Sequence, residues 1–198
     1  MFFGSAGVFL ALALFVYLQG PLPGERILYE TVMAWASPGV TALFWWVNQL
    51  GNKWVLAPAA LLLFWAAPAA RRRWWLWAGV LLVAPVLEDL TKPLVGRFRP
   101  EGTAFGFPSG HVTAAAAFFL LVAYLGGKTA HRPAVRVLLW SAAGSVIALV
   151  GLARVVLRAH WPTDALGGAA LGLACVSLAA WYHEASPPAN HGRSATKR

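Results

Sequence analysis

The residues of this chain that are best able to do chemistry lie in three short segments. These segments are residues 92–100, residues 108–111 and residues 154–164. Together they hold five strong cations, of which Lys92, Arg99 and Arg154 carry the argument, with two histidines, a serine and a carboxylate, within a chain that is otherwise mostly apolar. An ionisable residue beside a membrane span is costly unless it is paired or functional. The combination points to the capture and hydrolysis of a phosphate ester.

Two of the three segments supply cations that can bind a phosphate group. Arginine guanidinium groups bind phosphate oxygens in a planar, bidentate way, and lysine supplies a point charge. Lys92, Arg99 and Arg154 can therefore surround a phosphate from three directions. Ser109 can donate its hydroxyl hydrogen. The amide of Gly110 is expected at a helix N-terminus, where N–H groups point at an anion and a glycine allows close approach.

The histidines suggest a nucleophile and an acid. His160 and Asp164 are four residues apart, so the carboxylate can orient the imidazole if Pro162 begins a helix. An oriented imidazole leaves its other nitrogen free to attack phosphorus. His111 comes from a different segment and can protonate the leaving oxygen.

The elements that carry these segments are expected to be membrane-spanning helices. The chain has 198 residues, of which 59% are hydrophobic and 12% are charged, whereas soluble domains have roughly 45–50% apolar and about 25% charged residues. Backbone groups in lipid must bond internally, so apolar spans should be helices. We therefore predict an all-α polytopic membrane protein with six spans, near residues 2–19, 54–70, 74–91, 111–126, 137–153 and 163–182.

Residues 31–50 are also apolar, but we interpret them as a helix that lies in the outer interface. A seventh span here would leave only residues 51–53 for the turn and would reverse the side of everything that follows. With six spans and a cytoplasmic N-terminus, the basic residues gather inside, as the positive-inside rule expects. These inside residues are Arg71, Arg72, Arg73, Lys128, Arg132, Arg136, Arg193, Lys197 and Arg198. All three chemical segments then lie on the outer face.

The rest of the chain fits a single membrane domain, which we expect in a bacterial inner membrane. We predict a single domain over residues 1–182 and a disordered basic cytoplasmic tail over residues 183–198. Residues 2–19 lack a basic n-region and a following cleavage site, so we read them as an uncleaved span. The net charge of +9 reflects topology, and the spans exclude a soluble nucleic-acid binder. Cys175 is the single cysteine, so no internal disulfide can form.

The three segments together resemble the motifs of the type 2 phosphatidic acid phosphatase family. The shared pattern is Lys92-x6-Arg99-Pro100, then Pro108-Ser109-Gly110-His111, then Arg154-x5-His160-x3-Asp164. The resemblance implies a mechanism without metal or cofactor, through a phosphohistidine, on a lipid whose phosphorylated head sits at the outer membrane surface. It implies His160 as nucleophile, Asp164 as its orienting partner and His111 as general acid. The implied phosphate-binding residues are Lys92, Arg99, Ser109, Gly110 and Arg154.

Two positions depart from the family pattern. Ala153 stands where the family usually has serine, and Arg158 stands where a glycine is common. We interpret Arg158 as a cation for a second phosphate or another head-group anion. Arg97 is read either as a head-group contact or as a contact with lipid phosphates. Glu88 precedes Lys92 by four residues, so the two are expected to pair along one helix.

We assign no catalytic role to the remaining histidines or to two threonines near the motifs. His131, His183 and His191 are expected to be solvated. Thr113 and Thr163 are expected to be local helix-end groups.

Three functional hypotheses stay open from the sequence. The first is a phosphatase acting on lipid phosphates or pyrophosphates, with undecaprenyl pyrophosphate, phosphatidylglycerol phosphate, phosphatidic acid and lipid A as candidate substrates. The second is a phosphotransferase that passes the phosphate to another lipid instead of water. The third is a non-catalytic lipid-binding or transport protein, which intact histidines and Asp164 argue against. The oligomeric state is left open.

Overall fold

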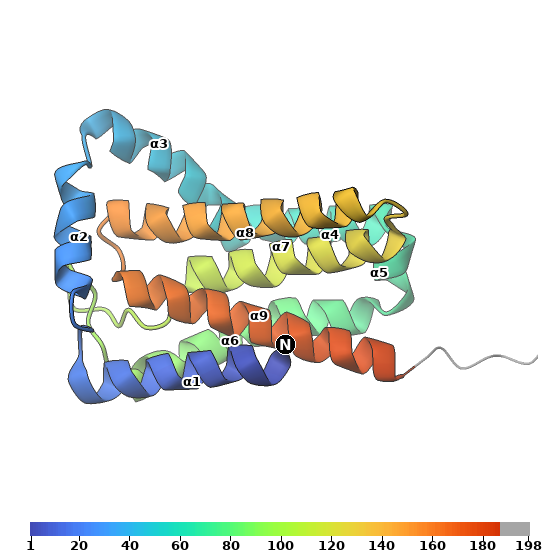
Figure 1. Ribbon diagram of the computed structural model, residues 1–198, viewed down its shortest axis with the longest axis horizontal. Coiled ribbons are helices and arrows are strands. Elements are labelled where there is room, and N and C mark those ends of the chain that lie inside the picture. Colours follow the sequence, from blue (N-terminus) through green and yellow to red (C-terminus); the bar gives the residue numbers. More distant parts are fainter. Residues whose placement is uncertain (187–198) are drawn as a thin grey trace, which may run out of the picture.

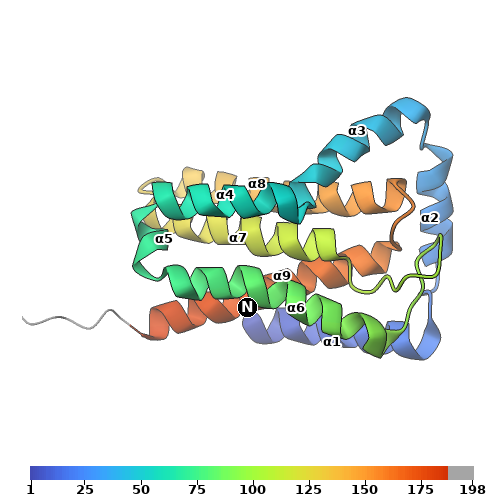
Figure 2. The same cartoon turned by 180° about the vertical axis from the view of Figure 1, so that it is seen from behind.

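The computed structural model describes residues 1–186 as a bundle of helices (Figure 1). Within this range the elements are α1 (Phe2–Gln19), α2 (Glu25–Ala34), α3 (Pro38–Asn48), a 3-10 turn (Gln49–Gly51), α4 (Lys53–Ala66), α5 (Pro68–Arg72), α6 (Trp74–Val95), α7 (Gly110–Thr129), α8 (Pro133–Val156) and α9 (Pro162–Ala185). Helices α1, α4, α6, α7, α8 and α9 run along the long axis, and α2 crosses one end of the bundle (Figures 1 and 2). The prediction of an all-α protein is confirmed.

Four of the described helices are long and apolar enough to cross a membrane, namely α1, α7, α8 and α9. Helix α4 is apolar but has only 14 residues. Helix α6 has 22 residues, but Glu88, Asp89 and Lys92 lie in its C-terminal part. The count of six spans therefore stays a prediction for α4 and α6.

The predicted span over residues 54–70 is interrupted in the structure. Helix α4 ends at Ala66, and Ala67 takes an extended conformation before Pro68 begins α5. The ring of a proline disfavours the helical conformation of the preceding residue, which explains the break. Helices α6 to α9 extend three or four residues beyond the C-terminal ends of the predicted spans, and α8 also begins four residues earlier, whereas α1 matches its predicted range.

The prediction of one interfacial helix over residues 31–50 is wrong in its boundaries. The segment is divided between α2, which ends at Ala34, and α3, which begins at Pro38. The Ser37 hydroxyl accepts a hydrogen bond from the Val40 amide at 3.4 Å, and Pro38 occupies the first helical position. Serine before proline is a strong helix-start signal that defines a new helix here.

The predicted tail begins too early, because α9 continues to Ala185. The His183 ring packs against Trp77 with a centroid distance of 5.1 Å and against Tyr124 at 6.2 Å. The expectation that His183 is solvated is therefore wrong, whereas His131 is exposed as expected. The rest of the predicted tail, with His191, lies outside the described residues.

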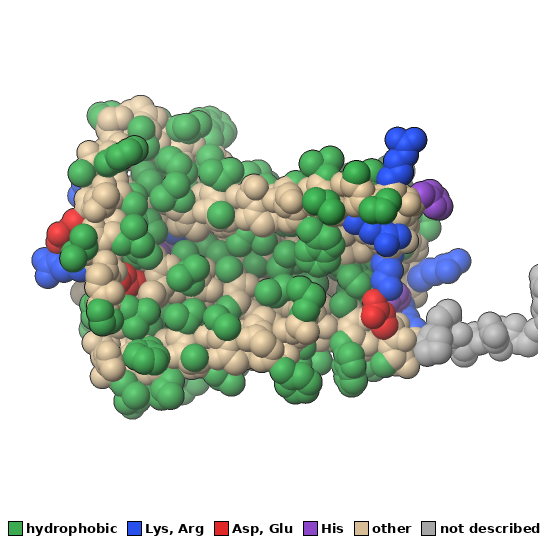
Figure 3. All heavy atoms as spheres, viewed as in Figure 1, with side chains coloured by type: hydrophobic (Ala, Val, Ile, Leu, Met, Phe, Trp, Pro, Cys, Tyr) green, Lys and Arg blue, Asp and Glu red, His purple; other side chains and the backbone are tan. Residues whose placement is uncertain are grey.

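Charged side chains gather at the two ends of the bundle, with apolar side chains between them (Figure 3). One end holds α5 and the turn between α7 and α8, with Arg71, Arg72 and Lys128. The opposite end holds α2, the segment between α6 and α7, and the link between α8 and α9 (Figures 1 and 2). The three chemical segments thus share one end of the molecule.

Close packing of α9 against α7 sets the geometry at this end. A Cβ atom on Gly168 would lie 2.6 Å from the Ser109 carbonyl oxygen and 3.1 Å from the Thr113 amide. Glycine is therefore required here for the two helices to approach. The first turns of α7 and α9 are brought side by side as a result.

Candidate active site

The three motif segments converge through bonds between the loop at residues 96–109 and the start of α9. The Ser109 amide donates to the Asp164 carbonyl oxygen at 2.9 Å, and the Trp161 indole donates to the Phe98 carbonyl oxygen at 3.1 Å. A Cβ atom on Gly106 would lie 2.7 Å from Asp164 Oδ2. The loop therefore passes directly over the carboxylate, and a side chain at position 106 would displace it.

His160 and Asp164 form a buried pair. His160 is 2% exposed, Asp164 is 0% exposed, and Nδ1 lies 3.3 Å from Oδ2. Because a carboxylate only accepts, Nδ1 carries the proton and Nε2 has the free lone pair. Asp164 Oδ2 also accepts from the Trp161 amide at 3.0 Å, and Pro162 begins α9 as the sequence predicts.

The link before His160 is a tight turn built on the end of α8. The amides of Ala159 and His160 both donate to the Arg154 carbonyl oxygen, at 3.0 and 3.1 Å. Arg158 has a φ of 56°, in the left-handed region that glycine adopts most easily. This backbone conformation gives a physical reason for the glycine that is common here in the family.

Burial lowers the pKa of the His160 imidazole below its ordinary value. The Asp164 carboxylate acts against this shift by bonding to the ring, and the nearby charges of Arg154 and Arg99 add to it. The imidazole is therefore neutral near pH 7. A neutral imidazole with a free Nε2 is the form that can attack phosphorus.

Two cations, Arg154 and Arg99, are held by neutral groups. Arg154 Nη1 donates to Asn48 Oδ1 at 2.8 Å, and Arg99 Nε donates to the Phe105 carbonyl oxygen at 3.3 Å. Within residues 1–186 neither cation has an acidic partner. Their charges are thus available to an anion.

Lys92 is held differently, because it forms an ion pair with Glu88 one turn earlier on α6. The predicted pairing is confirmed, and Asp89 adds a second contact at 3.5 Å. Glu88 is 5% exposed and lies against the start of α7, where a Cβ atom on Gly110 would meet its carboxylate at 2.8 Å. The glycine was expected to admit a ligand, but in this structure it makes room for Glu88.

His111 lies in the first turn of α7 and is partly buried. The titratable side chains of the other site residues act on it electrostatically; these are Arg154, His160, Arg99 and Lys92. Ser109, one residue before α7, is fully buried, and its hydroxyl has no hydrogen-bond partner among the described residues. A buried hydroxyl without a partner is rare and suggests that it serves a ligand.

Arg97 does not occupy the position that the sequence suggested. It is 7% exposed, and its guanidinium donates to Asp164 Oδ1 at 3.2 Å and to Glu25 Oε2 at 2.6 Å. The expectation that Arg97 contacts a head group or lipid phosphates is corrected, because burial and two carboxylates hold it inside the protein. Arg97 also lies over the Trp161 ring, 5.3 Å from its centroid.

Sequence reasoning missed Glu25 and Asn48. Glu25 Oε1 accepts from the amide and the hydroxyl of Thr163, so Thr163 is more than a local helix-end group. Thr113, in contrast, donates to the Ser109 carbonyl oxygen at 3.0 Å, as a local group would. The only signal for Glu25 is an acid in the short polar stretch between two apolar helices.

Arg158 is exposed and forms an ion pair with Glu101 at 3.0 Å. The two side chains are 56% and 58% exposed, so their attraction is weak in water. Arg158 lies at the rim of the site and can change partners at low energetic cost.

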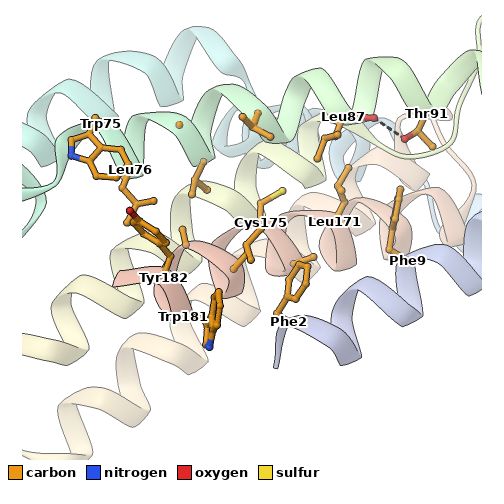
Figure 4. Close-up of a pocket in the computed structure, with 16 residues that line it drawn as sticks. Phe2, Phe9, Trp75, Leu76, Leu87, Thr91, Leu171, Cys175, Trp181 and Tyr182 are labelled. Atoms are coloured by element: carbon orange, nitrogen blue, oxygen red, sulfur yellow. Dashed lines mark hydrogen bonds between the residues drawn. The ribbon is translucent and has the colours of Figure 1, made fainter. Parts of the chain in front are cut away.

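An apolar cavity of about 700 Å³ lies between α1, α6 and α9 (Figure 4). It extends along α6 from Trp75 to Thr91, the residue next to Lys92. The lining is almost entirely apolar, with Phe2, Phe9 and Leu171 pointing into it from the neighbouring helices (Figure 4). Such a surface suits a hydrocarbon chain and not a phosphate.

The bundle, its apolar belt and the motif cluster at one end define an integral membrane phosphatase. Residues 72–187 match the PAP2 superfamily, and the chain belongs to this superfamily.

Its relatives include lipid phosphatases. The chain is 28% identical over 190 residues to phosphatidylglycerophosphatase B of Bacillus subtilis, covering 89% of this chain and 91% of that protein. It is 30% identical over 148 residues to decaprenylphosphoryl-5-phosphoribose phosphatase of Mycobacterium tuberculosis, covering 68% and 76% of the two chains. The crystal structure of a PAP2-type phosphatidylglycerolphosphate phosphatase from Bacillus subtilis superposes with a TM-score of 0.83, at 25% identity and over 94% of this chain and 97% of that one.

Proposed function

We propose that this protein hydrolyses a phosphate or pyrophosphate group from a membrane lipid through a phosphohistidine. His160 Nε2 attacks phosphorus, and the P–O bond to the lipid breaks as His111 protonates the leaving oxygen. Water then attacks phosphorus while His111 accepts its proton, and the P–Nε2 bond breaks to release phosphate and restore the His160 imidazole. No metal or cofactor takes part in this scheme.

The observation that carries the proposal is the buried His160–Asp164 pair together with two arginines, Arg99 and Arg154, that have no acidic partner within residues 1–186. The pair fixes the imidazole at 3.3 Å from its carboxylate, and Arg99 and Arg154 act electrostatically on the same ring. Phosphoryl transfer depends mainly on positioning and on charge stabilisation, which this arrangement provides. Lys92, Ser109 and Gly110 complete the proposed phosphate-binding set.

A lipid substrate is supported by the apolar cavity and by the relatives. The cavity ends at Thr91, so a chain lying in it would place its head group near Lys92. The candidate substrates remain undecaprenyl pyrophosphate, phosphatidylglycerol phosphate, phosphatidic acid and lipid A phosphates. We assign Arg158 to a second phosphate or another head-group anion at the rim of the site.

We further propose that the site faces the outer side of a bacterial inner membrane and that the termini are cytoplasmic. The gathering of basic residues at the opposite end supports this orientation (Figure 3). In a Cys175→Ala background, Glu101→Cys should react with a membrane-impermeant maleimide on intact cells, and His131→Cys only after lysis. The reverse labelling pattern would contradict the orientation.

The function is tested by phosphate release from a panel of lipid phosphates and pyrophosphates in detergent with a chelator present. We expect release by the wild type, none by His160→Ala, and normal release by His131→Ala, which changes an exposed histidine at the opposite end. Release that needs a metal, or that survives in His160→Ala, would contradict the mechanism. Label appearing in a second lipid instead of free phosphate would indicate a transferase.

A further inference from the structure

The start of α2 is tied to the catalytic carboxylate by a buried chain of charged groups. Glu25 is 4% exposed and binds Arg97, and Arg97 binds Asp164, which orients His160. Thr163 joins the chain through its amide and hydroxyl, which both donate to Glu25. These contacts connect three parts of the sequence that the catalytic motifs alone do not explain.

The two oxygens of Asp164 have different partners. Oδ2 faces His160 and the Trp161 amide, whereas Oδ1 accepts from Arg97 at 3.2 Å. The charge of Arg97 therefore competes with the imidazole for the same carboxylate. Glu25, on the far side of Arg97, offsets part of that charge.

A purely structural attachment of α2 would not need these charges. Replacing a buried ion pair with apolar groups of similar size is often neutral or stabilising. Apolar groups, however, could not place a positive charge beside Asp164 or a negative charge behind it. The arrangement suits a device that sets how strongly the carboxylate attracts a proton to His160.

We infer that Glu25 and Arg97 are positioning residues that orient Asp164 and set the protonation of His160 through it. The inference rests on the proposed function, in which neutral His160 is the nucleophile. The other charged or titratable groups that act on His160 are Arg154 from α8, Arg99 from the loop before α7, and His111 from α7. Since the test variants leave these groups in place, changes in titration report on the Glu25–Arg97 pair.

Opposite substitutions should move the titration of His160 in opposite directions. Arg97→Gln removes a positive charge near Asp164 and should raise the titration midpoint by roughly 0.5–1 pH unit. Glu25→Gln leaves Arg97 less neutralised and should lower the midpoint by a similar or smaller amount. The double variant removes one charge of each sign, so its midpoint should return close to that of the wild type.

Two readouts in purified, full-length protein test the inference. One is the acidic limb of the pH profile of kcat/KM, and the other is hydrogen–deuterium exchange at the C2 position of His160, which needs no turnover. Arg26→Gln and Glu30→Gln are the matched controls, because this ion pair lies on the same helix with side chains 80% and 61% exposed. These controls should leave both readouts unchanged.

Each outcome is decisive. Unchanged titration in Arg97→Gln and in Glu25→Gln would overturn the inference, even if the melting temperature falls, because the buried charges would then only hold α2 in place. If Arg97→Gln does not fold, Glu25→Gln decides the question by itself, because the inference requires its midpoint to fall. Exchange that shifts as expected in a protein without phosphatase activity would refute the proposed function and leave the inference standing. Phosphatase activity in variants whose His160 titration midpoint does not move would refute the inference and leave the proposed function standing.

Discussion

The hydrogen bond from Arg154 to Asn48 offers a sharp test of how phosphate is bound. Asn48 Oδ1 accepts from Arg154 Nη1 at 2.8 Å, and Asn48 is 8% exposed. The amide orients the guanidinium without neutralising it. Asn48→Asp would keep the size and the acceptor while adding a negative charge beside the cation.

The expected loss follows from Coulomb's law. A phosphate bound on the other side of the guanidinium would lie about 6–7 Å from the new carboxylate, which costs roughly 2–3 kcal/mol per phosphate charge at an effective dielectric constant of about 20. This corresponds to a fall in kcat/KM of at least about 30-fold. Asn48→Ala removes only a hydrogen bond to a charged group, for which we expect a loss of roughly 10-fold.

Initial rates of phosphate release at several lipid concentrations would measure these losses, with Gln49→Glu as the control. Gln49 is the next residue and is partly exposed, so the same added charge should have a much smaller effect there. If Asn48→Asp retained wild-type kcat/KM, or lost no more than Gln49→Glu, Arg154 would not be binding the phosphate. The assignment of the site would then have to change.

Three further predictions concern the same site. Burial lowers the pKa of His160, and the neutral ring is the nucleophile, so activity should persist as the pH falls below 6.5 and be lost only at the lowered pKa. A pH profile of kcat/KM whose acidic midpoint lies at or above 6.5 would contradict this prediction. Gly106→Ala places a Cβ atom 2.7 Å from Asp164 Oδ2 and should reduce kcat roughly 10–100-fold through misplacement of the pair, in a protein whose folding is checked by its melting temperature. Arg158→Ala should reduce kcat/KM for lipid pyrophosphates more than for monophosphates, and an equal effect on all substrates would remove the proposed second-phosphate contact.

The local part of the candidate site could be predicted from the sequence. His160 and Asp164 are four residues apart around a helix start at Pro162, so their contact depends on a single turn of chain. The pairing of Lys92 with Glu88 follows from helical spacing in the same way. Such contacts are encoded within a few residues and do not depend on the rest of the fold.

The long-range part could not be predicted, because it depends on how α2 and α3 fold back over the bundle. Glu25 and Arg97 are 72 residues apart, and Asn48 and Arg154 are 106 residues apart. The prediction of a single helix over residues 31–50 overlooked the break at Ser37 and Pro38. This break lets α2 and α3 run in different directions. Without that break, neither Glu25 nor Asn48 could be placed near the motifs.

The distribution of acids explains which cations can receive a phosphate. Among residues 1–186, the carboxylates of this end of the bundle partner Lys92, Arg97, Arg158 and, on α2, Arg26. Arg99 and Arg154 are left with a carbonyl oxygen and an amide oxygen, which orient a guanidinium but do not cancel its charge. A phosphate monoester carries up to two negative charges, so these two arginines can neutralise it while Lys92 adds a partly compensated third cation. Because acids pair with the other cations, the net positive charge of the site is about equal in size to the negative charge of the proposed phosphate ligand.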